Sequence, residues 1–430
     1  MSSTAAADVE FRGLLPHEIE AWLDHVSEVF KSVGRRPTRS YFVNHYYNDP
    51  YRDVDGIRVA VLHGQIVSTV RVFFRKIYLR GREVSVGGIG EVSTKPEFRS
   101  KGFAGKLLHD AIKFMSGKGI CLSVLHTGAA IPYYETLGWR CIPRHFKNTT
   151  VTLDLESRHR KDSKYYVRRV DWKQHDTSPE LVHAIAALYS SYSRRFNGAT
   201  VRDSAYWTSW VPAESPHAFV AERSGGDVVG YLSVRFDRDR PALNNPSQSS
   251  QPSPHNSPYT SPRQESSREN LHITVKEFSC SDGEYEADQG KSILEAMIQQ
   301  VLYEWRFSSA VVKYPLPIVP WMAPPMSSIS SPHLAHTDSG IGSSTLSTTN
   351  GQAGSAIGPV GIELDRGTMF RVTDPVILGS LGFEIFNESG EMVIWDENTT
   401  HWLQLLLCGQ VPSLHLPVPS HYVSWDTDGF

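Results

Sequence analysis

Residues 84–139 read VSVGGIGEVSTKPEFRSKGFAGKLLHDAIKFMSGKGICLSVLHTGAAIPYYETLGW and decide how this chain folds. A run over 84–94 has the β-branched and small residues of a strand and stops before Pro96. An amphipathic helix begins near Phe103, because apolar side chains then recur at helical spacing. The residues between them, 99–105, read RSKGFAG and are basic and small. Free N–H groups at a helix start, the positive end of its dipole and glycines that let the backbone approach predict a pyrophosphate-binding loop.

The composition is that of an ordinary globular protein. The chain has 430 residues, of which 40% are hydrophobic and 21% charged, and its formal net charge is −3. This length predicts two or three domains. The sequence has no apolar run near the ~20 residues that span a bilayer, and its charge balance gives no signature of nucleic-acid binding. The four cysteines lie far apart without a C-x-x-C pair, which argues against disulfides or structural zinc and fits a reducing cytoplasm.

Residues 10–155 form the first predicted unit. A helix is expected over 16–31, because Pro16 suits a first helical turn and apolar residues follow at helical spacing. Strand-like runs at 58–62 and 66–74 flank a His-Gly-Gln turn, which predicts a hairpin. Beyond the strand over 84–94 and the helix from 103, we expect a buried strand at 120–125, a short helix at 129–137 and a strand from 139.

Residues 160–320 form a second predicted unit with a similar order of elements. Helical periodicity at 181–192 and 292–305, and a glycine-containing turn at 225–227 between two strand-like runs, repeat the first unit. Where the first unit has its basic loop, the second has SDGEYEADQGKS at 281–292, whose four carboxylates would repel a pyrophosphate. We therefore expect one donor-binding site in the chain.

Two further segments are of low complexity. Residues 237–269 and 323–358 are rich in Ser, Pro, Gly, Asn and Thr and carry few aliphatic side chains. Such segments bury too little surface to offset the entropy of ordering, which predicts a disordered insert in the second unit and a disordered linker after it. Residues 359–430 form a small third piece of α+β character, with strand-like runs at 368–372 and 391–395.

The order R-x-x-G-x-A at 99–104, followed by Y-Y-x-x-L-G-W at 133–139, resembles the GCN5-related N-acetyltransferases (GNAT). The resemblance implies tandem GNAT-like folds of the α/β (α+β) class, in which a mixed, twisted sheet is flanked by helices. It also implies an acyl-CoA-dependent N-acyltransferase, with acetyl-CoA as the co-substrate and no metal. The second unit would be a degenerate copy without a cofactor site.

In this family the donor is held at two places. The pyrophosphate binds at the loop and helix start, which here are Arg99, Ser100, Lys101, Gly102, Phe103, Ala104 and Gly105. The pantetheine arm pairs with the exposed backbone of the preceding strand, which here carries Val92, Ser93 and Thr94. Backbone N–H groups of this strand are also natural donors to the thioester carbonyl. Taken without the resemblance, the same run would equally make an ordinary central strand.

The resemblance also implies the acid, whereas the base stays open. A tyrosine at the start of the second motif protonates the departing thiolate in the family, and it corresponds to Tyr134. A phenol with a pKa near 10 suits a proton donor at neutral pH. We interpret Tyr133 as a packing residue. Two candidates for the base are Glu91 on the donor strand, acting through water, and His126 at the end of the following strand, which titrates in the right range.

The layout is similar to the Eis (enhanced intracellular survival) acetyltransferases. These combine an active GNAT domain, a second GNAT-like domain and a C-terminal domain resembling sterol-carrier proteins. Their terminal carboxylate is the base, which implies the α-carboxylate of Phe430 as a third candidate here. The family's early helical region, here residues 41–47, is implied to line the acceptor side. The piece over 359–430 is short for a sterol-carrier-like domain.

Two alternatives to acetyl transfer stay open. N-myristoyltransferases also use tandem GNAT folds and a C-terminal carboxylate base, so a longer acyl-CoA is a possible donor. A CoA-binding regulator whose disordered inserts recruit partners is the non-enzymatic alternative. The expected acceptor is an amine-bearing small molecule or peptide. Neither nucleic acid nor a membrane is an expected partner, and the oligomeric state is open.

Overall fold

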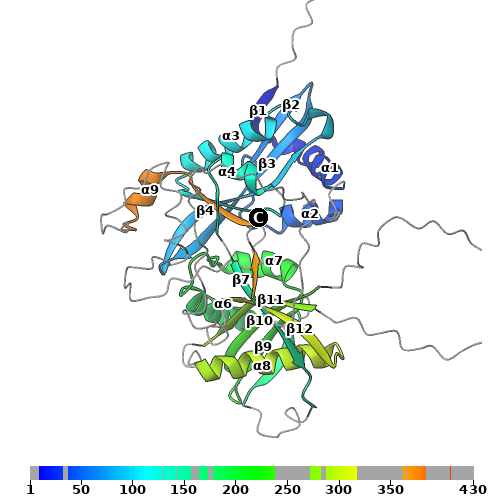
Figure 1. Ribbon diagram of the computed structural model, residues 1–430, viewed down its shortest axis with the longest axis vertical. Coiled ribbons are helices and arrows are strands. Elements are labelled where there is room, and N and C mark those ends of the chain that lie inside the picture. Colours follow the sequence, from blue (N-terminus) through cyan, green and yellow to red (C-terminus); the bar gives the residue numbers. More distant parts are fainter. Residues whose placement is uncertain are drawn as a thin grey trace, which may run out of the picture.

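The chain forms two seven-stranded sheets, one above the other in Figure 1, each flanked by helices. The computed structural model describes residues 9–31, 37–128, 130–142, 144–155, 164–172, 178–237, 272–281, 287–316, 362–365, 367–383 and 407. Apart from residue 237, the two segments predicted to be disordered, 237–269 and 323–358, lie outside these residues.

The first sheet has the strand order β1-β2-β3-β4-β5-β14-β6. Neighbours are antiparallel except β4 and β5, which run parallel. The expected hairpin joins β2 and β3, and its turn takes His63 and Gly64 at φ angles of 51° and 74°. The strands are β1 (Glu10–Gly13), β2 (Ile57–Leu62), β3 (Gln65–Leu79), β4 (Arg82–Thr94), β5 (Leu122–His126), β6 (Arg140–Cys141) and β14 (Thr368–Val372).

Helices cover both faces of this sheet, as alternation along β2 makes clear. Ile57 and Val59 pack in one cluster with Trp22 of α1, whereas Ala60 packs in another with Leu107 of α3. Residues two apart point to the same face of a strand, so the sheet lies between these helices. The helices are η1 (Pro16–Glu18), α1 (Ile19–Phe30), α2 (Arg39–Tyr47), η2 (Pro96–Phe98), α3 (Phe103–Gly117) and α4 (Ile131–Thr136).

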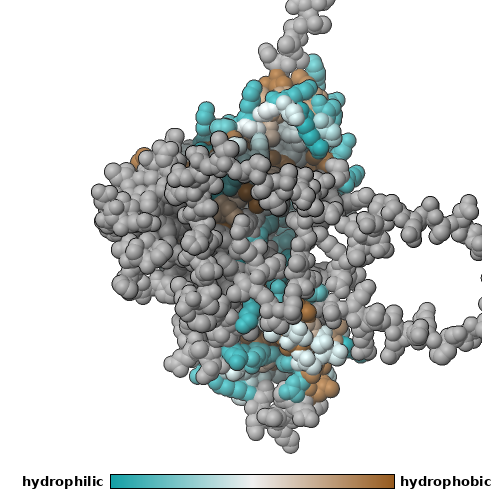
Figure 2. All heavy atoms as spheres, in the orientation of Figure 1, coloured by the Kyte–Doolittle hydropathy of each residue, from teal (hydrophilic) through white to brown (hydrophobic). Residues whose placement is uncertain are grey.

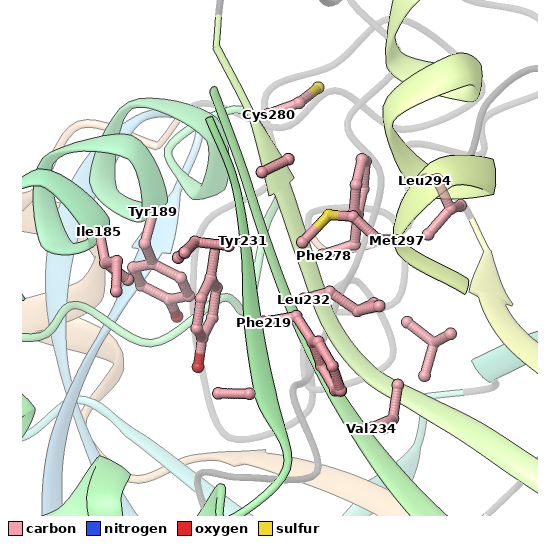
Figure 3. Close-up of a cluster of buried hydrophobic side chains, with 14 of the residues drawn as sticks. Ile185, Tyr189, Phe219, Tyr231, Leu232, Val234, Phe278, Cys280, Leu294 and Met297 are labelled. Atoms are coloured by element: carbon pink, nitrogen blue, oxygen red, sulfur yellow. The ribbon is translucent and has the colours of Figure 1, made fainter. Parts of the chain in front are cut away.

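The second sheet has the order β13-β7-β12-β11-β10-β9-β8 and is likewise covered on both faces. Figure 3 shows Tyr231 pointing toward Tyr189 of α6, while the next residue, Leu232, points to the side of Met297 on α8. The strands are β7 (Arg144–Thr152), β8 (Tyr166–Val170), β9 (Ala218–Glu222), β10 (Val228–Asp237), β11 (His272–Cys280), β12 (Ser309–Leu316) and β13 (Ile362–Asp365). The helices are α6 (Pro179–Ser193), α7 (Ser204–Glu214) and α8 (Ala287–Glu304).

The two sheets exchange strands. β6 and β7 follow each other directly, yet β6 joins the first sheet and β7 the second. β13 and β14 are also consecutive, yet β13 pairs with β7 in the second sheet and β14 inserts between β5 and β6 in the first. Orange segments therefore occur in both halves of Figure 1. Each sheet is complete only with a strand from far along the chain.

The predicted third piece, 359–430, contributes to these sheets where it is described. Its expected strand at 368–372 is confirmed as β14, and a short helix α9 (Pro375–Ser380) follows. Leu378 of α9 packs with Phe370 and with Val84 at the start of β4. The strand expected at 391–395 lies outside the described residues, and the domain boundaries stay a prediction.

The surface of the described residues is mixed in character. Figure 2 shows mainly hydrophilic residues with scattered hydrophobic ones on the visible face. Among the described helices, none combines the length and the apolar character needed to cross a membrane.

Strand exchange predicts that the first unit is not stable alone. A fragment of residues 10–155 lacks β14 and exposes the edge of β5, where the full chain pairs residues 122–126 with 368–372. We expect this fragment to melt without cooperativity or to aggregate, because an uncovered apolar edge strand invites wrong pairing. Fusing residues 367–383 to the fragment through a flexible linker should restore a cooperative transition in circular dichroism. A cooperative melt of the unfused fragment would contradict this account.

Candidate functional site

The loop between β4 and α3 has the backbone of an anion-binding site. Gly102 begins the helix at a φ of 78°, and Ser100 also has a positive φ, of 62°. No side chain caps this helix start, and no acidic residue lies in its first turn. The first helical hydrogen bond runs from Lys106 N–H to the Gly102 carbonyl at 3.1 Å, so the N–H groups before it are left for a ligand. The start of α3 is thus a positively polarised, uncapped helix end.

Basic side chains lie in and beside this loop, and Arg99 bonds the strand before it. Arg99 Nε donates to the carbonyl oxygen of Thr94, the last residue of β4, at 3.2 Å. The ammonium group of Lys101 lies 5.0 Å from the ring centre of Phe98, and that of Lys106 lies 5.2 Å from the ring centre of Phe11. Cations at a helix start oppose the dipole, so these lysines add to the positive potential at the start of α3 and do not stabilise the helix.

The preceding strand β4 changes its pairing just before this loop. Its parallel pairing with β5 ends at Ile89 and Leu125, although β4 continues to Thr94. Opposite β3, two residues of β4 face one of β3, because Ser93 pairs with Thr69 but Gly90 pairs with Arg71. Such a β-bulge redirects backbone groups and is frequent beside active sites. On the side of β5, residues 90–94 have no strand partner in the described part of the chain.

Glu91 lies in this bulge at a φ of 53°, which is uncommon for a residue with a side chain. Its side chain is 6% exposed, and its Oε1 is 3.2 Å from His45 Nδ1 and 3.3 Å from Arg71 Nη1. Its other oxygen, Oε2, is buried without a hydrogen-bond partner among the described residues. Leaving a buried acceptor unpaired costs about 1–3 kcal/mol, so Oε2 marks a place for a ligand proton or a water.

A buried ion-pair network supports Glu91. Arg71 also pairs with Asp49 at 3.1 Å, and Arg75 pairs with the other oxygen of Asp49 at 3.0 Å. The guanidinium of Arg71 lies 4.0 Å from the ring centre of Phe73. Two arginines and two carboxylates balance in charge, which is the condition under which buried ions are tolerated.

Sequence reasoning missed this network. It did predict that residues 41–47 lie near the site, and His45 in that segment touches Glu91. The two arginines were the available signal, because Arg71 and Arg75 interrupt an otherwise apolar run and fall on one face of the strand. Their carboxylate partners are not adjacent in sequence, so the pairing could not be read from spacing.

The two tyrosines of α4 differ in environment. Tyr134 is 8% exposed, and its ring packs edge-on against Trp139 with centres 6.0 Å apart. Burial raises the pKa of Tyr134 to about 12, and the neighbouring Tyr133 phenol adds to the rise. Tyr133 is 40% exposed, and its hydroxyl lies 3.6 Å from where a Cβ on Gly105 would be. A small residue at 105 therefore leaves room between α3 and α4.

The other predicted residues divide between described and undescribed parts. His126 is exposed at the end of β5, and its Nδ1 lies 3.4 Å from the Thr368 hydroxyl on β14. Val92, Ser93 and Thr94 lie at the end of β4, where Ser93 and Thr94 still pair with β3 but no described strand pairs on the side of β5. Phe430 lies outside the described residues.

A buried histidine of α1 contacts β4 at Ser93. His25 of α1 is 3% exposed, with Nδ1 3.1 Å from the Ile66 carbonyl and Nε2 3.1 Å from the Ser93 hydroxyl. A carbonyl only accepts, so Nδ1 carries the proton, and in the neutral ring Nε2 accepts from Ser93. The Ser93 hydroxyl thus donates its hydrogen bond to His25 of α1.

Two hollows in the described residues are lined by neither Glu91 nor Tyr134. One of about 490 Å³ lies between α1 and the turn of the β2–β3 hairpin, and His25 and Lys95 are among its lining residues. The other, of about 1080 Å³, lies between the two sheet units and is lined by side chains that include Tyr51, Arg75 and Arg202. Neither hollow therefore marks the candidate site. We locate the site instead from the backbone geometry of β4 and the start of α3.

The His25 ring predicts a pH dependence of stability. Burial lowers its pKa to about 4, whereas the unfolded chain titrates near 6.5. Since the unfolded chain binds the proton more readily, stability is full above pH 6.5 and is lost as the pH falls toward 4. The loss at pH 5 is about 2 kcal/mol. His25→Gln has no titrating ring, so its stability deficit relative to wild type in urea unfolding should shrink from pH 7.5 to pH 5. Parallel pH profiles for the two proteins would show that His25 titrates normally.

Comparisons with known proteins identify the family of the first unit and the type of fold. The profile described as "Acetyltransferase (GNAT) domain" matches residues 10–142. A GCN5-related N-acetyltransferase from Anabaena variabilis ATCC 29413 shares 13% identity at a TM-score of 0.53, covering 85% of this chain and 73% of that chain. One from Kribbella flavida shares 14% identity at a TM-score of 0.50, covering 86% and 72%. No curated protein matches the sequence.

The Eis1 protein of Mycobacterium abscessus is also among the similar structures, with 14% identity, a TM-score of 0.48, and coverage of 85% of this chain and 74% of that chain. Identities this low speak to fold, and the two proteins with higher scores show the mixed α/β GNAT-like fold. The matched sequence profile covers the uncapped helix start, the bulged strand and the Y-Y-x-x-L-G-W motif together. Residues 10–142 therefore belong to the GNAT acetyltransferase family.

Proposed function

We propose that this protein transfers an acetyl group from acetyl-CoA to a primary amine of a small molecule or peptide, by direct attack in a ternary complex in the cytoplasm. One observation carries the proposal. Strand β4 leaves β5 at Ile89, bulges at Glu91 and leads through η2 to the uncapped start of α3. A linear donor with a pyrophosphate at one end and a thioester at the other fits this arrangement. Its thioester end would lie along the backbone groups of β4 that no strand pairs with on the side of β5, and its pyrophosphate would lie at the N–H groups that begin α3.

The backbone supplies the donor contacts in this proposal. N–H groups at the start of α3 bind the pyrophosphate, and Lys101 and Lys106 add positive charge. Residues 92–94 pair with the pantetheine arm, and an N–H group at the bulge donates to the thioester carbonyl as charge develops on its oxygen. The hydrogen bond from Arg99 to Thr94 holds the end of the strand next to the loop.

Glu91 is the proposed base. Its Oε1 is held by His45 and Arg71, while Oε2 is the buried oxygen without a partner in the described residues. Oε2 takes a proton from the acceptor ammonium, directly or through one water, and the free amine attacks the thioester carbonyl. His126 and the α-carboxylate of Phe430 remain the rival candidates from the sequence.

Tyr134 is the proposed acid. The carbon–sulfur bond breaks as the carbon–nitrogen bond forms, and the thiolate takes the phenol proton of Tyr134. The phenolate in turn takes the second proton that the nitrogen loses as it becomes an amide. Because the pKa of Tyr134 is raised to about 12, the phenol keeps its proton throughout the neutral range. Its buried position also limits competition from water.

The helix start predicts a charge-specific loss of donor affinity. A Cβ on Gly102 meets no atom within 4 Å, and Asp and Asn are the side chains that best tolerate its positive φ. Gly102→Asp places a carboxylate where we expect the pyrophosphate, whereas Gly102→Asn has the same size without the charge. Calorimetric titration with acetyl-CoA should show Gly102→Asp binding at least about tenfold more weakly than Gly102→Asn. Equal affinities would place the pyrophosphate elsewhere.

If Tyr134 is the acid and Glu91 the base, removing either group should lower kcat. Thiol release from acetyl-CoA is measured against a panel of aminoglycosides, polyamines, lysine and short peptides. With the best acceptor, we expect Tyr134→Phe and Glu91→Gln each to lower kcat about 100-fold, the order of magnitude of acid–base contributions. Their acetyl-CoA affinity, measured in parallel, should stay within about twofold because neither side chain holds the pyrophosphate.

Different outcomes of that assay would contradict different parts of the proposal. Unchanged kcat in Glu91→Gln would transfer the role of base to His126 or to the carboxylate of Phe430. Binding of acetyl-CoA without thiol release for any amine would favour a regulator or a longer acyl donor.

A further inference from the structure

The C-terminal strand β14 reaches the helix that carries the proposed acid. β14 lies between β5 and β6, with Arg371 opposite Ser123 and Phe370 opposite Arg140. β6 follows α4 after only three residues, so β14 runs beside the end of that helix. A residue more than 230 positions from Tyr134 in sequence is thereby placed at the motif that contains it.

Arg371 contacts the Leu-Gly-Trp part of that motif. Its Nη1 donates to the Leu137 carbonyl, and its guanidinium lies 5.4 Å from the ring centre of Trp139. Gly138 has a φ of 90°, and a Cβ there would lie 3.0 Å from Arg371 Nη1. The backbone conformation at 138 favours glycine, and a side chain there would also displace the arginine packed over it.

Leu137 and Trp139 in turn contact Tyr134. The N–H groups of Leu137 and Trp139 both donate to the Tyr134 carbonyl, at 3.0 Å and 3.1 Å. The Trp139 ring packs edge-on against the Tyr134 ring at an angle of 78°. Two continuous routes, one through the backbone and one through the aromatic rings, thus connect Arg371 to the proposed acid.

We propose that Arg371 is a positioning residue for Tyr134, acting through Leu137 and Trp139, so that the C-terminal strand takes part in acid catalysis. The inference rests on the proposed role of Tyr134. A cation at the end of α4 also matches the negative end of the helix dipole. Arg140 does the same from β6, where its Nη1 donates to the Glu135 and Trp139 carbonyls at 2.9 Å each.

Arg82 provides a matched control. Its Nη1 donates to the Leu381 carbonyl at 2.6 Å, and its guanidinium lies 5.8 Å from the ring centre of Phe383. It thus fastens the same C-terminal segment to the first sheet at the start of β4, away from α4. Arg82→Ala reports general loosening of the segment, whereas Arg371→Ala adds loss of the contact with the motif.

The experiment is a double-mutant cycle in the full-length protein, with thiol release from acetyl-CoA as the readout. We expect Arg371→Ala to lower kcat at least tenfold with acetyl-CoA affinity within twofold of wild type, and Arg82→Ala to change kcat less than twofold. In a Tyr134→Phe background, Arg371→Ala should lower kcat no further, because the group that it positions is already gone. Arg371→Lys, which keeps the charge and part of the reach, should recover some of the kcat lost in Arg371→Ala.

Several results would overturn the inference. A kcat for Arg371→Ala equal to that of Arg82→Ala would make Arg371 structural only. So would a loss of kcat in Arg371→Ala that multiplies with the loss in Tyr134→Phe. Full activity of Tyr134→Phe would overturn the proposed acid together with this inference, whereas the first two results leave the acid intact. If Arg371→Ala does not fold, Arg371→Lys and Arg82→Lys provide the same comparison, and equal kcat values for these two would count against the inference.

Discussion

The ion pair between Arg71 and Glu91 is the interaction on which the rest of the site depends. It joins β3 to the bulge of β4, where Glu91 takes a positive φ of 53°. Such a conformation costs on the order of 1–3 kcal/mol and persists only when its surroundings hold it. Here Arg71, His45 and the Asp49–Arg75 pair fix the carboxylate from the side of α2. The bulge lies just after the point where pairing with β5 ends, on the strand edge that a donor would occupy in the proposal.

The second constraint is the exchange of strands between the sheets. β7 completes the second sheet, and β14 completes the first. Phe73 and Tyr78 of β3 also pack in the core of the second unit, and Trp210 of α7 lies 4.8 Å from His45 in ring-centre distance. The network around Glu91 is therefore enclosed partly by the second unit. A unit expected to lack a donor site still has a physical role, because it buries the charges that shape the first.

Local features of the site were predictable from sequence. Pro96, Gly102 and the helical spacing after Phe103 fix a strand, a loop and a helix by short-range rules, and all three are confirmed. Tyr134 was placed on a short helix, which is confirmed as α4. The hairpin and the first helix were likewise local, because their turn and capping residues are neighbours in the chain.

Long-range features were not predictable. Thr368–Val372 reads as a strand, but nothing in those residues names β5 and β6 as its partners. The contact of Arg371 with Leu137 and that of His25 with Ser93 join segments whose sequences carry no mutual signal. Glycines at 87, 88 and 90 precede the bulge at Glu91, but they do not say which residue takes the positive φ, and here a charged residue adopts the conformation that glycine usually takes. Pairing across the sheet, rather than propensity, decides these features.

The central claim is that the donor lies along the edge of β4 that faces β5, beyond Ile89, and along the start of α3. Hydrogen–deuterium exchange of the full-length protein, with and without acetyl-CoA, tests this location directly. The account predicts slower exchange of the backbone amides of residues 92–94 and 103–105 when acetyl-CoA is bound. Protection confined to the hollow between the two units, around residues 51–54 and 201–203, would contradict it.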